Sequence, residues 1–340
     1  LQEIGDTVLL TEAAADLLRS PLRPIVLASV AARASLAPSV APGLGEIGVF
    51  LPYSPLHHLL LNAFAAPLVA TSGNLSGEPV LTDNDEAARR LAAIADGFLQ
   101  HDRPIERPAD DPVFRQIGTA MRPLRIGRGC APLELALPFT LERPLLATGG
   151  HMKNTLALAW EDRVVVSPHI GDMGSPRSLD VFERVGADLQ RLYGIDVQEL
   201  VCDAHDGYTT SRWARRQTMP LARVWHHHAH ASALAAEHDI DRDWLMLTWD
   251  GVGLGEDGTL WGGEALWGRP GNWRRVASLR PFRLPGGDKA GREPWRSACG
   301  VCWEMGRHWD AAPDDSGLLR TAWERELNCP VTSAAGRLFD

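Results

Sequence analysis

Short apolar runs alternate with helical patterns along the first part of the chain. In two segments the apolar positions recur as they do on one face of a helix, and two other segments are short apolar runs typical of buried strands. The predicted elements are a helix that Thr11 caps and that ends at Leu18, strands at 25–27 and 68–71, and a helix at 86–95 capped by Asp83 or Asn84. This alternation predicts an α/β fold, in which loops at strand ends bind ligands.

The later part of the chain adds strands that end in glycine-rich turns. The predicted strands lie at 145–148, 155–160, 163–167, 200–202, 222–225, 245–249 and 260–267, and the predicted helices at 179–193 and 226–238. Repeated units of strand, glycine turn and strand between helices favour an actin-type nucleotide fold, although the pattern alone does not establish it.

The tryptophans are unevenly distributed, which divides the chain. All twelve lie at Trp160 or beyond it. Pro132, Pro138 and Pro144 punctuate the stretch before it, and proline at this density interrupts helices and suits an extended linker. A length of 340 residues also fits two domains. We expect a first domain at 1–137, a linker at 138–144 and a second domain at 145–340.

Charge and cysteine content restrict the class of partner. Acidic residues outnumber basic ones by 43 to 34, which argues against an evenly basic nucleic-acid-binding surface. No apolar run is long enough to span a membrane, and no signal peptide is visible at the start of the chain. Five cysteines are sparse and odd in number, which fits a reducing compartment. We therefore expect a cytoplasmic protein without nucleic-acid or membrane partners.

Four histidines within five residues give the sharpest chemical signal. In a helix, His226 and His230 are four positions apart and share one face, so both imidazoles can bind one metal ion. His227 and His228 are then expected to point elsewhere. The alternative is a surface cluster that binds nothing. Two histidines do not complete a metal site, so a third ligand has to come from elsewhere in the chain.

Asp250 is a candidate partner of this pair, because it follows the apolar strand predicted at 245–249. A carboxylate at a strand end can hold a metal ion or its water. Gly251 and Gly253 follow it, and glycines let backbone N–H groups approach a phosphate. The alternative is an ordinary glycine-rich hairpin with Asp257-Gly258 as its turn.

Further glycine turns suggest a nucleotide cradle in the second domain. Gly149-Gly150 precede Lys153, one of only two lysines in the chain, and Asn154 and Thr155 follow. This stretch lacks the spacing of a Walker A loop. Gly262-Gly263 form another tight turn. Several such turns in one domain favour nucleotide binding more than any single turn does.

The first domain carries another set of candidate ligand-binding groups. Ser72, Gly73 and Asn74 follow the strand predicted at 68–71, and such small polar groups can bind phosphate or a planar urea-like group. Arg122, Arg125 and Arg128 follow later and could neutralise a polyphosphate. The alternative for the arginines is an edge strand that faces solvent.

Taken together, these motifs resemble the HypF family of carbamoyltransferases, which act in the maturation of nickel–iron hydrogenases. The resemblance is specific, since it covers nearly the whole chain in the order of the family. The matching stretches are residues 41–44, 51–58, 70–79 (ATSGNLSGEP), 110–111, 128–129, 149–155, 169–172, 202–208, 226–230, 250–264 and 284–295.

The resemblance implies two domains with different chemistry. The first domain resembles a YrdC-like domain that makes carbamoyl adenylate from ATP, with Mg²⁺, and carbamoyl phosphate. The other domain is similar to a TsaD-like domain of actin type that holds a divalent metal, Fe²⁺ or Zn²⁺, and passes the carbamoyl group to the C-terminal cysteine thiolate of HypE.

The resemblance also assigns roles to residues. His226 and His230 match the metal-binding histidines of the family. Asp250 matches an active-site aspartate and is expected to join the two histidines as a metal ligand, and Asp250 and Lys153 are the expected catalytic residues. The residues expected to bind nucleotide or carbamoyl adenylate are Ser72, Gly73, Asn74, Arg122, Arg128, Gly149, Gly150, Asn154, Thr155, Gly251, Gly253, Gly262 and Gly263.

The chain also departs from the family pattern. An N-terminal acylphosphatase-like domain and zinc-finger modules, an early basic motif and a final stretch with another aspartate ligand are expected in the family and do not occur within these residues. Asp110-Asp111 are followed by Pro112, where the family often has serine. We therefore expect a fragment of a longer enzyme.

Three other functions remain open on the sequence alone. An O-carbamoyltransferase of antibiotic tailoring shares both domains, but its TsaD-like domain usually comes first. A truncated, non-catalytic binding subunit would dock a partner. A tRNA threonylcarbamoylation enzyme is disfavoured by the acidic balance and by the hydrogenase-type stretches.

Overall fold

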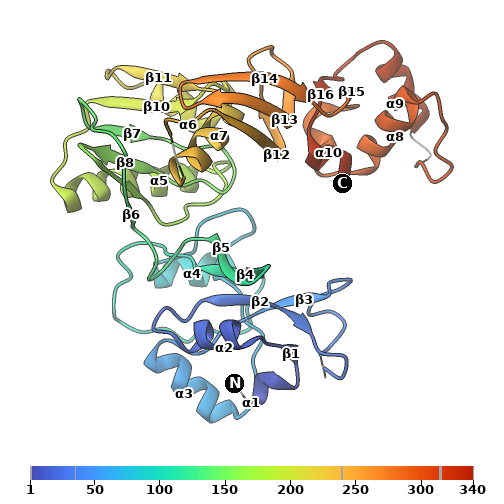
Figure 1. Ribbon diagram of the computed structural model, residues 1–340. Helices are drawn as coiled ribbons and strands as arrows, with labels where there is room; N and C mark the ends of the chain where they lie inside the picture. The colour runs from blue at the N-terminus through green and yellow to red at the C-terminus, as the bar shows by residue number, and fades with distance from the viewer. Residues whose placement is uncertain (1, 35, 239, 314–315, 340) are drawn as a thin grey trace. The chain divides into compact units, whose positions relative to one another are not determined.

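The structure is a computed structural model that describes residues 2–34, 36–238, 240–313 and 316–339 (Figure 1). The chain forms two compact units, each made of two segments. Unit 1 consists of Leu1–Ala136 and His151–Val197, and unit 2 of Leu137–Gly150 and Gln198–Asp340. Helices and strands occur together in both units, which confirms the predicted α/β class.

A mixed five-stranded sheet forms the first part of unit 1. Its strands are β1 (Val8–Leu9), β2 (Ile25–Val30), β3 (Glu46–Val49), β4 (Val113–Ile117) and β5 (Ala120–Arg125). The central β2 pairs antiparallel with β1 and β3 and parallel with β4, and β5 is the edge strand beside β4. The strand predicted at 25–27 is therefore confirmed as the middle of this sheet.

Capping residues fix where the helices of this part begin. The helices are α1 (Gln2–Gly5), α2 (Glu12–Arg19), α3 (Pro55–Phe64) and α4 (Asn84–Leu91). The Thr11 hydroxyl accepts a hydrogen bond from the N–H of Ala14, as predicted, and the Asp83 carboxylate accepts one from Glu86. Ala14 and Leu18 of α2 are buried against Val26 of β2, which forms the core beneath the sheet.

Two predictions for this part are wrong. Residues 68–71 form no strand, and Leu68 and Val69 are exposed, so Ser72 does not follow a strand end. A short apolar run has no periodicity that separates a strand from a loop, and only a partner strand makes it part of a sheet. The helix predicted at 86–95 ends at Leu91, where a turn begins.

The segment 151–197 completes unit 1. β9 (Arg163–Val166) pairs antiparallel with β6 (Leu133–Ala136) and β8 (Ala157–Trp160), and α5 (Pro176–Tyr193) follows. The strands predicted at 155–160 and 163–167 and the helix predicted at 179–193 are thereby confirmed.

Polar contacts tie this segment to the rest of unit 1. His169 Nδ1 lies 2.6 Å from Asp110 Oδ2, and Arg177 Nη1 donates to Glu86 Oε1 at 2.7 Å. The predicted domain boundaries at 137 and 145 stay a prediction. The two units are defined by which residues lie close together, and that does not show where one domain fold ends and the next begins. Residues 1 and 340, the outer limits of the predicted domains, lie outside the described residues.

Unit 2 begins with parallel strands. β10 (Glu199–Asp203) lies between β7 (Leu145–Ala147) and β11 (Leu221–Val224) and pairs parallel with both. The helices α6 (Thr209–Ala214) and α7 (His226–Ala236) follow β10 and β11 in the chain. The carboxyl ends of parallel strands are where open α/β sheets bind ligands, and β10 ends at Asp203 while β11 leads directly into α7.

A mixed sheet, antiparallel except where β13 and β16 pair, forms the other part of unit 2. Its strands are β12 (Trp244–Leu254), β13 (Leu260–Arg269), β14 (Asn272–Ser278), β15 (Phe282–Arg283) and β16 (Val331–Thr332). Helix α7 covers one face, where Ala231 and Ala235 pack with Met246, Trp261 and Leu266. The remaining helices are η1 (Gly287–Gly291), α8 (Trp295–Glu304), α9 (Ser316–Glu324) and α10 (Ala335–Phe339).

The expectation that a strand ends at Asp250 is wrong. β12 continues to Leu254, but its pairing with β13 is irregular: Trp249 lies opposite Gly263, and Gly253 lies opposite Trp261. The three residues Asp250, Gly251 and Val252 thus lie opposite the single residue Gly262. Such an irregularity bends a strand and redirects its side chains. In the sequence, the same residues have the pattern of a strand end.

In the described part of the chain, no helix is both long enough and apolar enough to cross a membrane.

Candidate metal centre

Two imidazole groups and one carboxylate group converge at one place in unit 2. His226 and His230 come from the first two turns of α7, one above the other as their spacing predicts, and Asp250 comes from the irregular part of β12. His226 Nε2 lies 3.3 Å from His230 Nε2 and 3.0 Å from Asp250 Oδ2, and His230 Nε2 lies 3.8 Å from Asp250 Oδ2.

This geometry fits a divalent cation. The circle through three points at these separations has a radius of about 2.0 Å, and nitrogen and oxygen ligands bind Zn²⁺ at ~2.0–2.2 Å. The Asp250 Oδ2 atom is buried, and the Nε2 atoms of His226 and His230 lie within 4 Å of it, as expected of an oxygen that shares a metal ion with two imidazoles. Two imidazoles and one carboxylate suit Zn²⁺ or Fe²⁺ and leave coordination positions open.

Asp203, the last residue of β10, fixes the orientation of His226. Its Oδ2 atom lies 2.7 Å from His226 Nδ1, and its Oδ1 atom accepts the N–H of His205 at 2.8 Å. A carboxylate on Nδ1 leaves Nε2 as the ligating atom and makes the imidazole more basic. Sequence reasoning missed this residue, although it is an acidic residue directly after an apolar strand, the same signal that identified Asp250.

The acidic neighbours set the charge of the metal-free centre. Burial by itself lowers the pKa of His226, but the hydrogen bonds and charges of Asp203 and Asp250 outweigh it and raise that pKa to about 9. Burial and the charge on His226 lower the pKa of His230. Burial raises the pKa of Asp250, but the hydrogen bond and charge of His226 outweigh it, so the net shift is downward. The centre therefore presents a carboxylate to a cation.

The other two histidines lie outside the three-ligand cluster. His227 is fully buried, and its ring centroid lies 6.1 Å from that of Trp261. Its Nε2 atom is nevertheless only 3.8 Å from Asp250 Oδ2, so this ring is closer to the centre than its place on the helix predicts. Burial, together with the charge on His226, lowers the pKa of His227 to about 4, so this ring is neutral.

Two of the predicted phosphate-binding glycines adjoin the histidines. A Cβ atom at Gly253 would lie 2.6 Å from His226 Cδ2 and 2.7 Å from His227 Cε1, so glycine is required for the rings to approach β12. A Cβ atom at Gly150 would lie 3.8 Å from His226 Cε1, and the neighbouring Gly149 carbonyl accepts a hydrogen bond from Thr210. The 149–150 turn is thus part of the surroundings of the centre.

The other predicted glycines make close backbone contacts. The N–H groups of Gly262 and Gly263 donate to Glu264 Oε1, and the Gly251 carbonyl accepts a hydrogen bond from Arg337 Nε at 3.3 Å. Whether any of these residues binds nucleotide stays a prediction.

Lys153, Asn154 and Thr155 belong to unit 1 and not to the unit that carries the histidines. Lys153 is exposed and has a left-handed backbone (φ 50°), and its N–H donates to Asp172 Oδ1 at 2.9 Å. Asn154 is buried, and its N–H donates to the carbonyl of Gly171. The predicted roles of these three residues remain predictions.

The polar turn of the first domain is held by its own amide side chain. Asn74 Nδ2 donates to the carbonyls of Leu75 and Glu78, at 2.9 and 3.0 Å, whereas Ser72 and Gly73 are exposed. Asn74 therefore shapes the loop that presents Ser72 and Gly73 to solvent.

The two candidate arginines of the first domain differ in their surroundings. Arg122 is exposed on the edge strand β5. The Arg128 guanidinium donates to Asp111 Oδ1 and to the carbonyls of Leu22 and Arg23, and it lies 3.5 Å from the ring centroid of Tyr53. These contacts of Arg128 stabilise unit 1 and need no bound ligand. Arg128 also lines a cavity of about 240 Å³ in the same unit, together with Arg107, Asp110 and His169.

Three domain families match the chain, each over a separate stretch. The family described as telomere recombination (Sua5, YciO and YrdC) matches residues 2–127, the HypF Kae1-like domain matches residues 140–237, and the second subdomain of the carbamoyltransferase Kae1-like domain matches residues 246–340. Their order confirms the predicted fold, a YrdC-like domain followed by a Kae1-like (TsaD-like) domain.

Relatives of similar sequence are carbamoyltransferases named HypF. The chain is 41% identical to that of Synechocystis sp., over 96% of this chain and 45% of the relative. It is 42% identical to that of Rhodobacter capsulatus, over 100% of this chain and 47% of the relative. The chain thus spans about half the length of the relatives it matches.

Solved structures agree with these matches. A full-length HypF in its phosphate- and nucleotide-bound form superposes with a TM-score of 0.94 at 32% identity, over 100% of this chain and 54% of that one. HypF of T. kodakarensis superposes with a TM-score of 0.92 at 29% identity, over 100% of this chain and 47% of that one.

Proposed function

This chain belongs to the HypF family, and from that premise we propose that it is the part of a carbamoyltransferase that activates a carbamoyl group with ATP and transfers it to a thiol. The observation that carries the proposal is the convergence of His226, His230 and Asp250 with Asp203 behind His226. The order of the matched domains, Sua5/YrdC first, favours this reaction over O-carbamoylation in antibiotic tailoring.

The first half of the reaction belongs to the YrdC-like domain. Water hydrolyses carbamoyl phosphate to carbamate and phosphate. A carbamate oxygen then attacks the α-phosphorus of ATP, the bond from that phosphorus to the β-phosphate oxygen breaks, and pyrophosphate leaves as carbamoyl adenylate forms. Arg122 is exposed on β5 and can bind phosphate oxygens, and the loop that Asn74 holds presents Ser72 and Gly73. Mg²⁺ would accompany the ATP, as it does for most nucleotide phosphates.

The other half of the reaction belongs to the centre in unit 2. When bound, a divalent metal there would polarise the carbamoyl carbonyl or its leaving group as a Lewis acid. His226, His230 and Asp250 would hold the ion, and Asp203 fixes the ring of His226 with its Nε2 atom directed toward that position. The thiolate sulfur attacks the carbamoyl carbon, the bond from that carbon to the AMP oxygen breaks, and AMP leaves.

The resemblance to the family supplies the partners of this proposal. The acceptor would be the C-terminal cysteine of HypE, the donor carbamoyl phosphate and the location the cytoplasm. In the second domain, Gly149 and Gly150 adjoin His226 and could hold the phosphate of the adenylate near the ion. Lys153 is a further candidate to neutralise a phosphate of the nucleotide.

Metal content and two partial reactions test the proposal together. His226→Ala and His230→Ala should each lose the bound metal, measured by mass spectrometry, and lose carbamoyl transfer to thiol. Both variants should keep carbamoyl-phosphate-dependent ATP–pyrophosphate exchange. The matched control is His238→Ala, an exposed histidine just beyond the same helix, which should change none of the three. Full metal content in both variants would overturn the proposed centre.

A further inference from the structure

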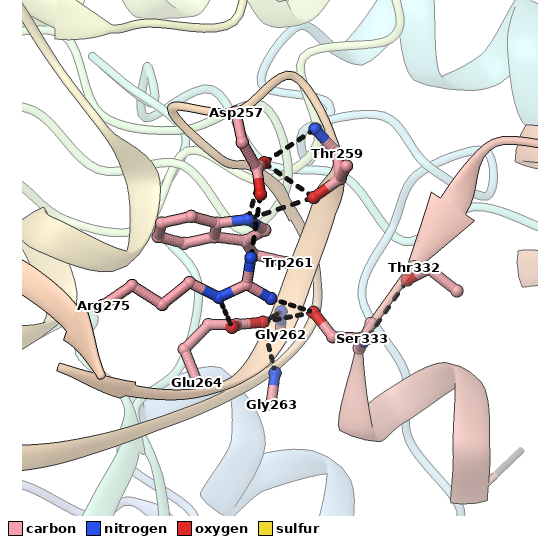
Figure 2. A network of polar contacts seen from close by, with 10 residues as sticks. Asp257, Thr259, Trp261, Gly262, Gly263, Glu264, Arg275, Thr332 and Ser333 are labelled. Carbon is pink, nitrogen blue, oxygen red and sulfur yellow. Dashed lines mark hydrogen bonds and ion pairs between the residues drawn. The ribbon is translucent and has the colours of Figure 1, made fainter. Parts of the chain in front are cut away.

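A buried carboxylate lies one strand away from Asp250, in a network of polar contacts (Figure 2). Glu264 of β13 is 1% exposed. Its Oε1 atom accepts the N–H groups of Gly262 and Gly263, at 3.1 and 3.3 Å, and the hydroxyl of Ser333. Its Oε2 atom accepts Arg275 Nε at 2.6 Å. The carboxylate thus accepts four hydrogen bonds and donates none.

The positive charge of this network, on the Arg275 guanidinium, also has several partners. Arg275 of β14 also donates to Asp257 Oδ2 at 2.8 Å, and its guanidinium lies 4.5 Å from the ring centroid of Trp261. Asp257 Oδ1 in turn accepts the N–H of Thr259 and the indole N–H of Trp261. A buried ion pair is retained at low cost only when both partners have further hydrogen bonds, and that condition is met in this network.

The Glu264 carboxylate binds backbone at the point where the register between β12 and β13 shifts. Gly262 lies opposite the irregular stretch that carries Asp250, and a Cβ atom on it would lie 2.7 Å from the Asp250 carbonyl oxygen. Glu264 binds the N–H group of this residue and that of Gly263, so it fixes the backbone against which Asp250 rests. A shift of Gly262 would therefore move Asp250.

The same carboxylate also fixes the segment on the other side of Asp250. Ser333, which binds Glu264, lies just before α10, and a Cβ atom at Gly336 of α10 would lie 2.6 Å from Gly251 Cα. Arg337 of α10 donates to the Gly251 carbonyl. Glu264 therefore holds two surfaces that contact Asp250 and its neighbour Gly251, one on β13 and one on α10.

We propose that Glu264 is a positioning residue for Asp250: its carboxylate locks the Gly262-Gly263 backbone and Ser333, so that Asp250 points at His226 and His230. This inference rests on the proposed metal centre. The position of Glu264 requires a side chain that only accepts hydrogen bonds, because all four of its partners are donors. Glutamine has the same shape, but its NH₂ group would face either the Arg275 guanidinium or the glycine N–H groups.

Cobalt binding provides a test that does not depend on activity. Co²⁺ replaces Zn²⁺ or Fe²⁺ at such sites, and its visible absorption reports the arrangement of the ligands. Glu264→Gln should bind Co²⁺ at least tenfold more weakly than the wild-type protein and show an altered visible spectrum. Glu256→Gln, the same change at an exposed position of the neighbouring turn, should match the wild type in both.

The outcomes separate this inference from the proposal on which it rests. If Glu264→Gln only unfolds at lower temperature and keeps the wild-type Co²⁺ affinity and spectrum, Glu264 is merely structural and the inference is wrong. If that variant does not fold, Ser333→Ala removes one of the four hydrogen bonds and should weaken Co²⁺ binding about threefold. An unchanged Ser333→Ala protein would overturn the inference. A wild-type protein that binds no Co²⁺ would overturn the metal centre itself.

Discussion

The Nδ1 atom of His226 lies 2.7 Å from the Oδ2 atom of Asp203, which joins the first residue of α7 to the last residue of β10. This contact fixes both the rotation of the imidazole ring and the nitrogen that remains free to bind a metal. Residues distant in sequence thus prepare the centre before any ion arrives, and mutation of the carboxylate should reveal its contribution.

We expect Asp203→Ala to weaken metal binding by about 10–100-fold, because carboxylates behind ligating histidines contribute on that scale. Asp203→Asn should have a smaller effect, since the amide oxygen can still accept from Nδ1. Affinity is measured by competition with a chelator for Zn²⁺. Asp206→Asn, an exposed acidic residue of the same loop, is the control and should bind as the wild type does. Equal affinities for Asp203→Ala and wild type would contradict the assigned role.

Metal binding should release about one proton per ion at neutral pH, because the ion replaces the proton on His226. Burial lowers the pKa of His226, but the carboxylates of Asp203 and Asp250 raise it to about 9 in the metal-free protein. The apparent affinity should therefore rise about tenfold per pH unit up to a pH near this pKa and level off above it. Calorimetry in two buffers with different heats of ionisation counts the protons. A plateau that starts near pH ~6.5, the ordinary histidine value, would argue against this charge state.

Gly253→Ala should damage both stability and metal binding. The added Cβ atom would lie 2.6 Å from His226 Cδ2 and force the ring or the strand to move. Such overpacking costs about 1–3 kcal/mol of unfolding free energy. Urea denaturation and Zn²⁺ competition measure the two effects. Gly317→Ala in α9 serves as the control, since its Cβ atom meets no neighbour within 4 Å, and should leave Zn²⁺ affinity unchanged. Wild-type affinity in Gly253→Ala would show that the ring tolerates displacement.

The two arginines of the YrdC-like domain should respond differently to mutation. Arg128→Lys loses hydrogen bonds to Asp111 and to backbone carbonyls, so we expect unfolding free energy to fall by about 1–3 kcal/mol. Arg122→Lys changes an exposed side chain and should leave stability within about 0.5 kcal/mol. If Arg122 binds ATP, its alanine variant should weaken ATP binding without a loss of stability. Equal stability losses at both positions would contradict this distinction.

The features that the sequence alone determined depend on interactions between residues close together in the chain. The hydroxyl of Thr11 caps a helix because its hydrogen-bond partner lies within the same turn, and the capped start was predicted correctly. His226 and His230 share a face because the helical repeat brings positions four apart together. Both features depend on residues within one or two turns of each other. The family resemblance, confirmed by the matched domains, likewise rests on local motifs kept in order.

Only the tertiary structure decided which distant residues complete the centre. Asp203 reaches His226 through the pairing of β10 with β11, and Glu264 reaches Arg275 and Ser333 through the pairing of β13 with β14 and β16. No periodicity within a segment encodes which strands pair. For the same reason the apolar run at 68–71 was wrongly expected to be a strand, because no partner strand pairs with it in the described part of the chain. Asp250 was taken for a strand end because the irregularity that redirects its side chain is a property of two strands together.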